Sequence, residues 1–285
     1  MKISHIFSSF LFPLFIGIIS PLFAFSQTTI DSSGMIRFTE IGNERDYSTI
    51  WPGTVKEIPA YQFKDDSELK SIKIEEGVTE IGEYCFLGCT SLEKVSLPST
   101  LKKIGEGAFR ECKSLKKLII PDGIEVIPSY MCYWDTSLDS IYLPQSVKDI
   151  GRSAFAYCHN LKLIQFPDSL THIGPNAFNE CRSLKKVEIP DSMEELESYA
   201  FADCSSLERI KLPANNKMLG ELLLIGCVNL KEIEIKSKEP PTFDCNSPLF
   251  DPSEKEMYRR CRLIIDSESE KKYSEAPVWE LFFKD

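Results

Sequence analysis

The sequence has little of what most enzymes and nucleic-acid-binding proteins need. It contains three histidines, only two of which, His159 and His172, follow the first 26 residues, and it has no glycine-rich phosphate-binding loop. The formal net charge is −10, so there is no basic excess to neutralise a nucleic-acid backbone. After residue 26 no apolar run is long enough to span a membrane. These absences argue against a nucleic-acid partner and an integral membrane protein, and the sequence predicts no cofactor.

Residues 1–26 have the pattern of an export signal. Lys2 precedes an apolar run over residues 10–25, and the small residues Ala24 and Ser26 favour cleavage before Gln27. The alternative is an uncleaved membrane anchor, but prolines interrupt the run, and it is shorter than the roughly 20 residues of a spanning helix. No cysteine follows the cleavage region to carry a lipid. We therefore expect a secreted or cell-surface protein, with a periplasmic location as the other possibility.

The most informative feature that is present is a repeat of 23 residues. Its shared pattern is I-G-x-x-A-F-x-x-C-x-S-L-x-x-I-x-L-P, and residues 104–126 are the cleanest copy. A period of this length is typical of a solenoid, in which each pass buries its apolar residues against its neighbours. One column of the repeat holds Ile58, Ile81, Ile104, Ile127, Ile150, Ile173, Leu196 and Leu219.

Each copy predicts one strand and one helical turn. Residues 115–120 alternate apolar and polar side chains and end at Pro121, as a short strand does. From Gly105 to Cys112 the apolar spacing is helical, which predicts one or two turns of α or 3₁₀ helix. Stacking about eight copies gives an α/β solenoid over residues 51–235, with a parallel β-sheet on one face and helical turns opposite.

The two ends depart from the repeat and are expected to cap the solenoid. Residues 27–50 form the predicted N-terminal cap, and residues 236–285 the C-terminal cap, with a last strand at 262–265 and a short helix from Ser267. Between the caps, phenylalanines in one column predict a stacked aromatic spine that breaks at Cys132 and Leu224. Its members are Phe63, Phe86, Phe109, Phe155, Phe178 and Phe201.

Ten cysteines in an exported chain suggest disulfides, but most of them share one column. Equivalent Cβ atoms on adjacent strands lie about 4.8 Å apart, whereas a disulfide needs about 3.5–4.5 Å. We therefore expect buried thiols there, and Cys85 and Cys132 to be interior fillers. Cys245 and Cys261, outside the repeat, are the best candidates for a disulfide. A row of equivalent ligands does not converge, so no metal site is predicted. The column contains Cys89, Cys112, Cys158, Cys181, Cys204 and Cys227.

The sequence offers no assembled catalytic group, so we expect no enzyme. Cys158 and His159 are neighbours, but the first lies in an inward column and the second in an outward one, too far apart for a nucleophile and its base. Carboxylate pairs such as Asp65-Asp66 fall in solvent-facing loops of the repeat. A hydrolase with an unrecognised site remains the alternative.

Three outward columns of the predicted sheet hold eleven basic and six acidic residues, although the chain as a whole is acidic. Lys94, Lys117, Lys186 and Arg209 lie in the middle column and could steer an acidic partner or a sulfated glycan onto the sheet. Alternatively, the lysines simply cover apolar strand edges with their aliphatic stems.

Five apolar or aromatic residues stand where other copies are polar. Ile119, Tyr142 and Leu163 lie on three consecutive passes of the sheet face and predict either one interaction patch or cross-strand pairs without a ligand. Tyr133 and Trp134 either bind a sugar or a protein or fill the volume lost at Cys132.

The unit from Ile150 to Pro167 resembles the BspA-type leucine-rich repeat, and the resemblance extends over residues 51–235. It implies a leucine-rich repeat solenoid and an exported protein of a host-associated Gram-negative anaerobe. The family includes adhesins, which implies a host extracellular-matrix or bacterial surface protein as the partner. A glycan-binding or envelope-associated module is the alternative. The resemblance assigns no binding residues.

Overall fold

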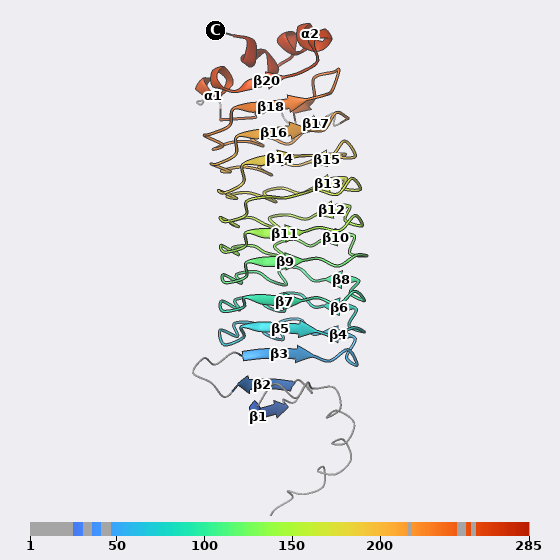
Figure 1. The fold of residues 1–285 in the computed structure, drawn as a ribbon. Helices are drawn as coiled ribbons and strands as arrows, with labels where there is room; N and C mark the ends of the chain where they lie inside the picture. The colour runs from blue at the N-terminus through green and yellow to red at the C-terminus, as the bar shows by residue number, and fades with distance from the viewer. Residues whose placement is uncertain are drawn as a thin grey trace, which may run out of the picture.

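The computed structural model describes residues 25–30, 36–40, 47–215, 218–243, 249–251 and 255–284. Its passes stack into an elongated column, with the N-terminal strands at one end and the C-terminal helices at the other (Figure 1). The predicted solenoid is confirmed, with about eight turns of about 23 residues. Strands one repeat apart pair in parallel and in register, as Lys186 and Arg209 do.

One ladder of the solenoid consists of the longer strands, which the sequence pattern predicts. Most of these strands bury their central apolar residue, as at Leu118 and Val187, and turn the flanking residues to solvent. Val95 is only partly buried. The pass that carries Leu163 contributes only a single bridge, between Ser140 and Leu163. The strands are β3 (Tyr47–Trp51), β5 (Ser71–Ile74), β7 (Lys94–Ser96), β9 (Lys117–Ile119), β11 (Ser140–Tyr142), β14 (Lys186–Glu188), β16 (Arg209–Leu212), β18 (Glu232–Ile235) and β20 (Arg262–Ile264).

A second parallel ladder, which the sequence analysis did not foresee, is made of strands of two residues. Its inward residues are the isoleucine and leucine column of the repeat. The strands are β4 (Glu57–Ile58), β6 (Glu80–Ile81), β8 (Lys103–Ile104), β10 (Val126–Ile127), β12 (Asp149–Ile150), β13 (His172–Ile173), β15 (Glu195–Leu196), β17 (Met218–Leu219) and β19 (Thr242–Phe243).

The segment expected to be helical is instead a run of hydrogen-bonded turns within the described repeats. Every second backbone N–H group there bonds to the next pass, as from Phe86 to the Ala108 carbonyl at 2.8 Å, and those between bond within the turn, as from Leu87 to the Tyr84 carbonyl at 3.1 Å. The bonds between residues four apart that define an α-helix are therefore not formed. Two residues of nearly every copy have positive φ, among them Tyr84 (50°) and Glu111 (62°). These left-handed residues break the helical path of the backbone, so that alternate N–H groups point to the next pass.

The aromatic spine lies in the core as predicted. Phe86 and Phe109 stack with ring centroids 5.2 Å apart, and Phe178 and Phe201 do the same at 5.2 Å. Cys132 interrupts the spine, and the buried Met131 stands where neighbouring copies have alanine. Met131 thus brings a larger side chain than alanine into the core of this pass.

Glycine occupies the second position of the repeat in five copies, and at Gly82 and Gly105 it allows a close approach between passes. A Cβ on Gly105 would lie 2.4 Å from the Glu83 nitrogen, and one on Gly82 would lie 2.4 Å from the Ala60 nitrogen. The glycine N–H donates to the preceding pass, as from Gly105 to the Ile81 carbonyl at 2.8 Å. The column therefore sets the spacing of the short-strand ladder.

The junction between one pair of passes is open on both ladders. Strands β7 and β9 belong to different sheets, and so do β8 and β10. Pro128 stands in the glycine column at this junction and has no N–H to donate. The turns still connect the two passes, because Phe109 donates to the Met131 carbonyl at 2.9 Å. We call this junction the seam.

Additional elements follow the repeats at both ends of the described solenoid. Strands β1 (Phe25–Ile30) and β2 (Ile36–Glu40) pair antiparallel and extend the sheet beyond β3. At the other end, β20 confirms the predicted last strand, and η2 (Ser267–Ser269) begins where a helix was expected. The buried Trp279 of η3 (Trp279–Phe283) donates to the Pro241 carbonyl at 2.7 Å. Helices α1 (Lys255–Arg260) and α2 (Glu270–Glu275) complete this end.

The proposed domain boundaries stay predictions, and residues 1–24 of the expected signal peptide lie outside the described residues. Among the described residues, no helix is both long enough and apolar enough to cross a bilayer.

Candidate binding surfaces

The outward residues of the longer strands form what we call the long-strand face. Ile119 and Tyr142 lie directly opposite each other in register, and Leu163 pairs with Ser140 on the next pass. Leu163 is therefore diagonal to Tyr142, a spacing of about 7–8 Å between Cα atoms that large side chains bridge. All three side chains are solvent-exposed, by 52%, 55% and 56%. They make one apolar patch on an otherwise charged face.

Basic residues surround this patch, but they are not equivalent. Lys186 pairs with Glu188, and Arg209 pairs with Glu234 at 2.5 Å. Lys94 and Lys117 are exposed and form no ion pair with another described residue. Of these four basic residues, the two without an ion pair to a described residue therefore lie beside Ile119.

A shallow hollow lies on the long-strand face where the seam opens between β7 and β9. Its volume is about 380 Å³, and its walls include the uncompensated lysines. The unpaired edges of β7 and β9, the exposed Ile119 and the two lysines therefore all lie at this hollow. The lining residues are Glu93, Lys94, Val95, Lys116, Lys117 and Ile119.

Tyr133 and Trp134 belong to a cluster of rings on the turns. Tyr133 lies 5.4 Å and Trp134 5.7 Å from the ring of Tyr157, centroid to centroid. The Arg110 guanidinium lies 5.0 Å from the Tyr133 ring and the Lys113 ammonium 5.7 Å from the Trp134 ring, so both rings have cation–π partners.

The expectation that these rings fill the volume lost at Cys132 is wrong for Trp134. The side chain of Trp134 is 41% exposed, whereas Met131 of the same pass is buried. Trp134 also has a positive φ of 67°, which belongs to the backbone pattern of this column. The aromatic cluster is therefore a surface feature.

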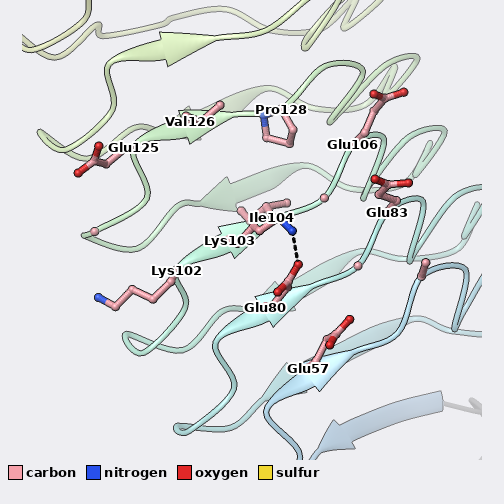
Figure 2. Close-up of a pocket in the computed structure, with 14 residues that line it drawn as sticks. Glu57, Glu80, Glu83, Lys102, Lys103, Ile104, Glu106, Glu125, Val126 and Pro128 are labelled. Carbon is pink, nitrogen blue, oxygen red and sulfur yellow. Dashed lines mark hydrogen bonds and ion pairs between the residues drawn. The ribbon is translucent and has the colours of Figure 1, made fainter.

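A groove of about 810 Å³ crosses the outward side of the short strands, which we call the short-strand face (Figure 2). It reaches from β4 to β10 and includes Val126 and Pro128 at the seam. Figure 2 shows Lys103 paired with Glu80. The sequence analysis did not identify this groove, because the short-strand ladder was not predicted. Its charged residues are Glu57, Glu80, Glu83, Lys102, Lys103, Glu106 and Glu125.

The cysteine column consists of buried thiols, as predicted. Each Sγ donates to the carbonyl 26 residues upstream, as from Cys112 to Phe86 at 3.2 Å and from Cys181 to Phe155 at 3.2 Å. Burial raises the pKa of Cys112 and Cys181 well above the ordinary value, which disfavours the reactive thiolate. Cys261 is also a buried thiol, and Cys245 lies outside the described residues, so the proposed disulfide stays a prediction.

The side chains of Cys158 and His159, which the sequence analysis expects to point in different directions, have separate surroundings. The Cys158 thiol donates to the Cys132 carbonyl at 3.2 Å, and burial lowers the pKa of His159.

The cysteine column is interrupted by Asp135, whose side chain is fully buried. Its Oδ1 accepts from the Cys112 N–H at 2.7 Å, and burial raises its pKa well above the ordinary value.

His172 is enclosed by carboxylates on the short-strand face. Its Nδ1 lies 3.0 Å from Asp149 Oδ2, and its Nε2 lies 2.7 Å from Glu197 Oε1 and 4.0 Å from Glu195 Oε2. Partial burial lowers the pKa of His172, but hydrogen bonds to Glu197 and Asp149 raise it further, so the net direction is upward. The sequence analysis did not anticipate this convergence, because it treated each column separately.

The chain matches the family model described as the BspA type leucine-rich repeat region, in six copies over residues 47–133 and 125–240. No curated protein matches it. The pneumococcal vaccine antigen PcpA is similar in structure, with a TM-score of 0.52, 18% identity and coverage of 87% of this chain and 80% of that chain. A leucine-rich repeat protein of T. pallidum, TpLRR, matches with a TM-score of 0.47, 23% identity and coverage of 72% and 87%.

Proposed function

Because the chain belongs to the BspA-type leucine-rich repeat family, we propose that it is an exported, non-enzymatic module that binds a protein through its long-strand face. Leucine-rich repeats of this kind typically bind other molecules and carry no catalytic groups. The observation that carries the proposal is the patch of Ile119, Tyr142 and Leu163, each more than half exposed on consecutive passes. Contiguous exposed apolar residues on a polar surface are characteristic of interaction sites.

The charges around the patch define the partner's chemistry. A partner that places an apolar side chain on Tyr142 and Ile119 would bring its rim close to Lys94 and Lys117. Acidic groups at that rim would gain complementarity, because these lysines have no partner among the described residues. We propose an adhesin-type role with a host extracellular-matrix or bacterial surface protein as the partner, and a secreted or cell-surface location.

The aromatic cluster supports a second candidate function, the binding of a glycan. Trp134 and Tyr157 present rings at a mutual angle of 70°, with Trp134 exposed. Exposed aromatic rings stack on sugar rings, and the Lys113 ammonium nearby would favour an acidic sugar. This candidate uses a surface formed by the turns, so the two functions can be separated by mutation.

The test compares binding to a panel of matrix proteins with binding to a glycan array. The double variant Tyr142→Ser, Leu163→Ser should lose protein binding by at least about tenfold, since buried apolar anchors carry most interface energy. Val228→Ser, which removes another exposed apolar side chain away from the patch, should leave binding unchanged. Equal binding by the double variant and the unaltered chain would contradict the assignment. Glycan binding lost only in Trp134→Ala would favour the second candidate.

A further inference from the structure

On the short-strand face, Glu195 and Glu197 converge on one nitrogen of His172, and Asp149 contacts the other. Asp149, His172 and Glu195 are Cα partners on the successive strands β12, β13 and β15. Glu197 follows β15 and stands in the column that is glycine in five other copies. Its N–H still donates to the Ile173 carbonyl at 3.0 Å, as the glycines do with their own preceding pass. The extra side chain therefore adds a carboxylate beside the imidazole without changing the backbone pattern.

The contacts of the imidazole call for a cation. Asp149 accepts the Nδ1 proton at 3.0 Å, which in a neutral ring leaves only a lone pair on Nε2. Glu197 Oε1 lies 2.7 Å from that nitrogen and also offers only lone pairs. Two lone pairs at this distance repel each other unless a proton or a metal ion lies between them. Glu195 adds a further negative charge 4.0 Å from Nε2.

We propose that His172, Glu195 and Glu197 bind a divalent transition-metal ion, with Asp149 orienting the imidazole. The three ligand atoms all lie within 4.8 Å of one another. Around an ion with bonds of about 2.0–2.2 Å, ligand atoms are about 3.3 Å apart. The two distances from Nε2, 2.7 and 4.0 Å, lie on either side of that value. Glu195 is exposed and Glu197 is partly exposed, so small rotations of the two side chains would bring both oxygens onto the ion.

The ligand types favour zinc or a similar borderline ion over calcium or magnesium. An imidazole nitrogen suits Zn²⁺, Co²⁺ or Ni²⁺, whereas Ca²⁺ and Mg²⁺ prefer oxygen ligands alone. The Nδ1 contact to Asp149 is the arrangement of most metal-binding histidines, in which a carboxylate sets the tautomer and the ring orientation. Three protein ligands leave one tetrahedral position to water or to a partner's side chain.

The open position has room for such a group. Glu195 and Glu197 also line a hollow of about 280 Å³ that continues to the next pass. Because His172 and Glu195 come from neighbouring strands, the ion would join two passes. Bound metal would therefore stabilise the folded solenoid, because these ligands come together only when the two passes are stacked.

The experiment titrates Zn²⁺ into the full chain at pH 7.5 by calorimetry. We expect one ion per chain and an affinity at least about tenfold weaker in His172→Gln and in Glu197→Gly. Asp149→Asn should weaken binding by about 10–100-fold, the usual effect of removing a group that orients a metal ligand. Glu197→Gly installs the residue that other copies have at this position, so its fold should be intact. Far-UV circular dichroism checks this.

Two controls separate the site from other zinc-binding groups. Glu194→Gln removes a neighbouring carboxylate outside the ligand set and should bind Zn²⁺ within about twofold of the unaltered chain. All variants keep the same cysteines, so zinc bound by thiols would be equal in every one. A second readout is the ¹⁵N shift of His172 Nε2, which should change on addition of Zn²⁺. Equal affinity in His172→Gln and the unaltered chain, or no binding at all, would overturn the proposal.

Discussion

Replacing Asp135 with cysteine, the residue of its column, should stabilise the protein increasingly as the pH rises. Asp135 is fully buried, and its Oδ2 has no hydrogen-bond partner. Each neighbouring cysteine donates its thiol proton to the carbonyl 26 residues upstream. For Asp135 the equivalent acceptor is the carbonyl of Phe109. An ionised carboxylate has no proton to donate to it, so only the protonated form of Asp135 can act as the cysteines do. Burial accordingly raises the pKa of Asp135, and the negative charge of Glu111 adds to this rise. Together they outweigh the hydrogen bonds from Cys112 and Cys132, which lower the pKa.

The sign of the pH effect follows from proton uptake. With a folded-state pKa above that of the unfolded chain, the native carboxyl keeps a proton that the unfolded chain has lost. The contribution of Asp135 protonation to the free energy of unfolding is thus complete below the unfolded pKa of about 3.9. It declines as the pH rises toward the folded pKa. The decline is up to about 1.4 kcal/mol per pH unit while the native form stays protonated. In Asp135→Cys this contribution is absent.

Urea unfolding at several pH values between 5 and 8, under reducing conditions, measures the effect. The difference in unfolding free energy between Asp135→Cys and the unaltered chain should grow with pH. Replacing the exposed Asp122 with asparagine should give a small difference with little pH dependence. A constant difference between Asp135→Cys and the unaltered chain would refute the reasoning, because it would mean that Asp135 has the same pKa in both states.

Two other predictions concern packing between passes. Gly105→Ala should reduce stability by about 1–3 kcal/mol in urea unfolding, because its Cβ would lie 2.4 Å from the Glu83 nitrogen; an unchanged midpoint would show that the passes are not in close contact. The described cysteines should react with a thiol reagent at least about a hundredfold more slowly in the folded protein than in guanidinium, because they are buried and burial raises the pKa of thiols such as Cys158. Rapid labelling of several thiols at pH 8 would contradict this.

Much of the interior could be predicted from the sequence, because the equivalent residues of a column all point the same way, either into the core or out to solvent. The phenylalanine spine, the buried thiols and the last strand all follow from a strict period and from the burial of apolar residues. The exposure of Tyr142 and Leu163 follows from the same alternation, since both flank a buried strand residue.

What could not be predicted depends on contacts between columns and on very short elements. A strand of two residues, such as β13, has no alternation for a pattern to reveal. The left-handed conformations of Tyr84 and Glu111 could not be predicted from their residue types, because glycine is the residue whose presence indicates a positive φ. The ion pair of Lys186 with Glu188 depends on the rotamers of long side chains. The binding roles of Lys94, Lys117, Lys186 and Arg209 stay predictions.

The distinctive surface features of this solenoid lie where a residue departs from the repeat pattern. Pro128 withholds a donor that glycine supplies elsewhere, and the seam opens at that junction with a groove on one face and a hollow on the other. Glu197 adds a carboxylate where glycine leaves space, and it contacts His172. In both cases the surrounding repeat keeps the backbone in place, so one substitution creates a local surface at little cost to the fold. Specific binding by a protein of this kind should therefore be sought first where its columns are interrupted.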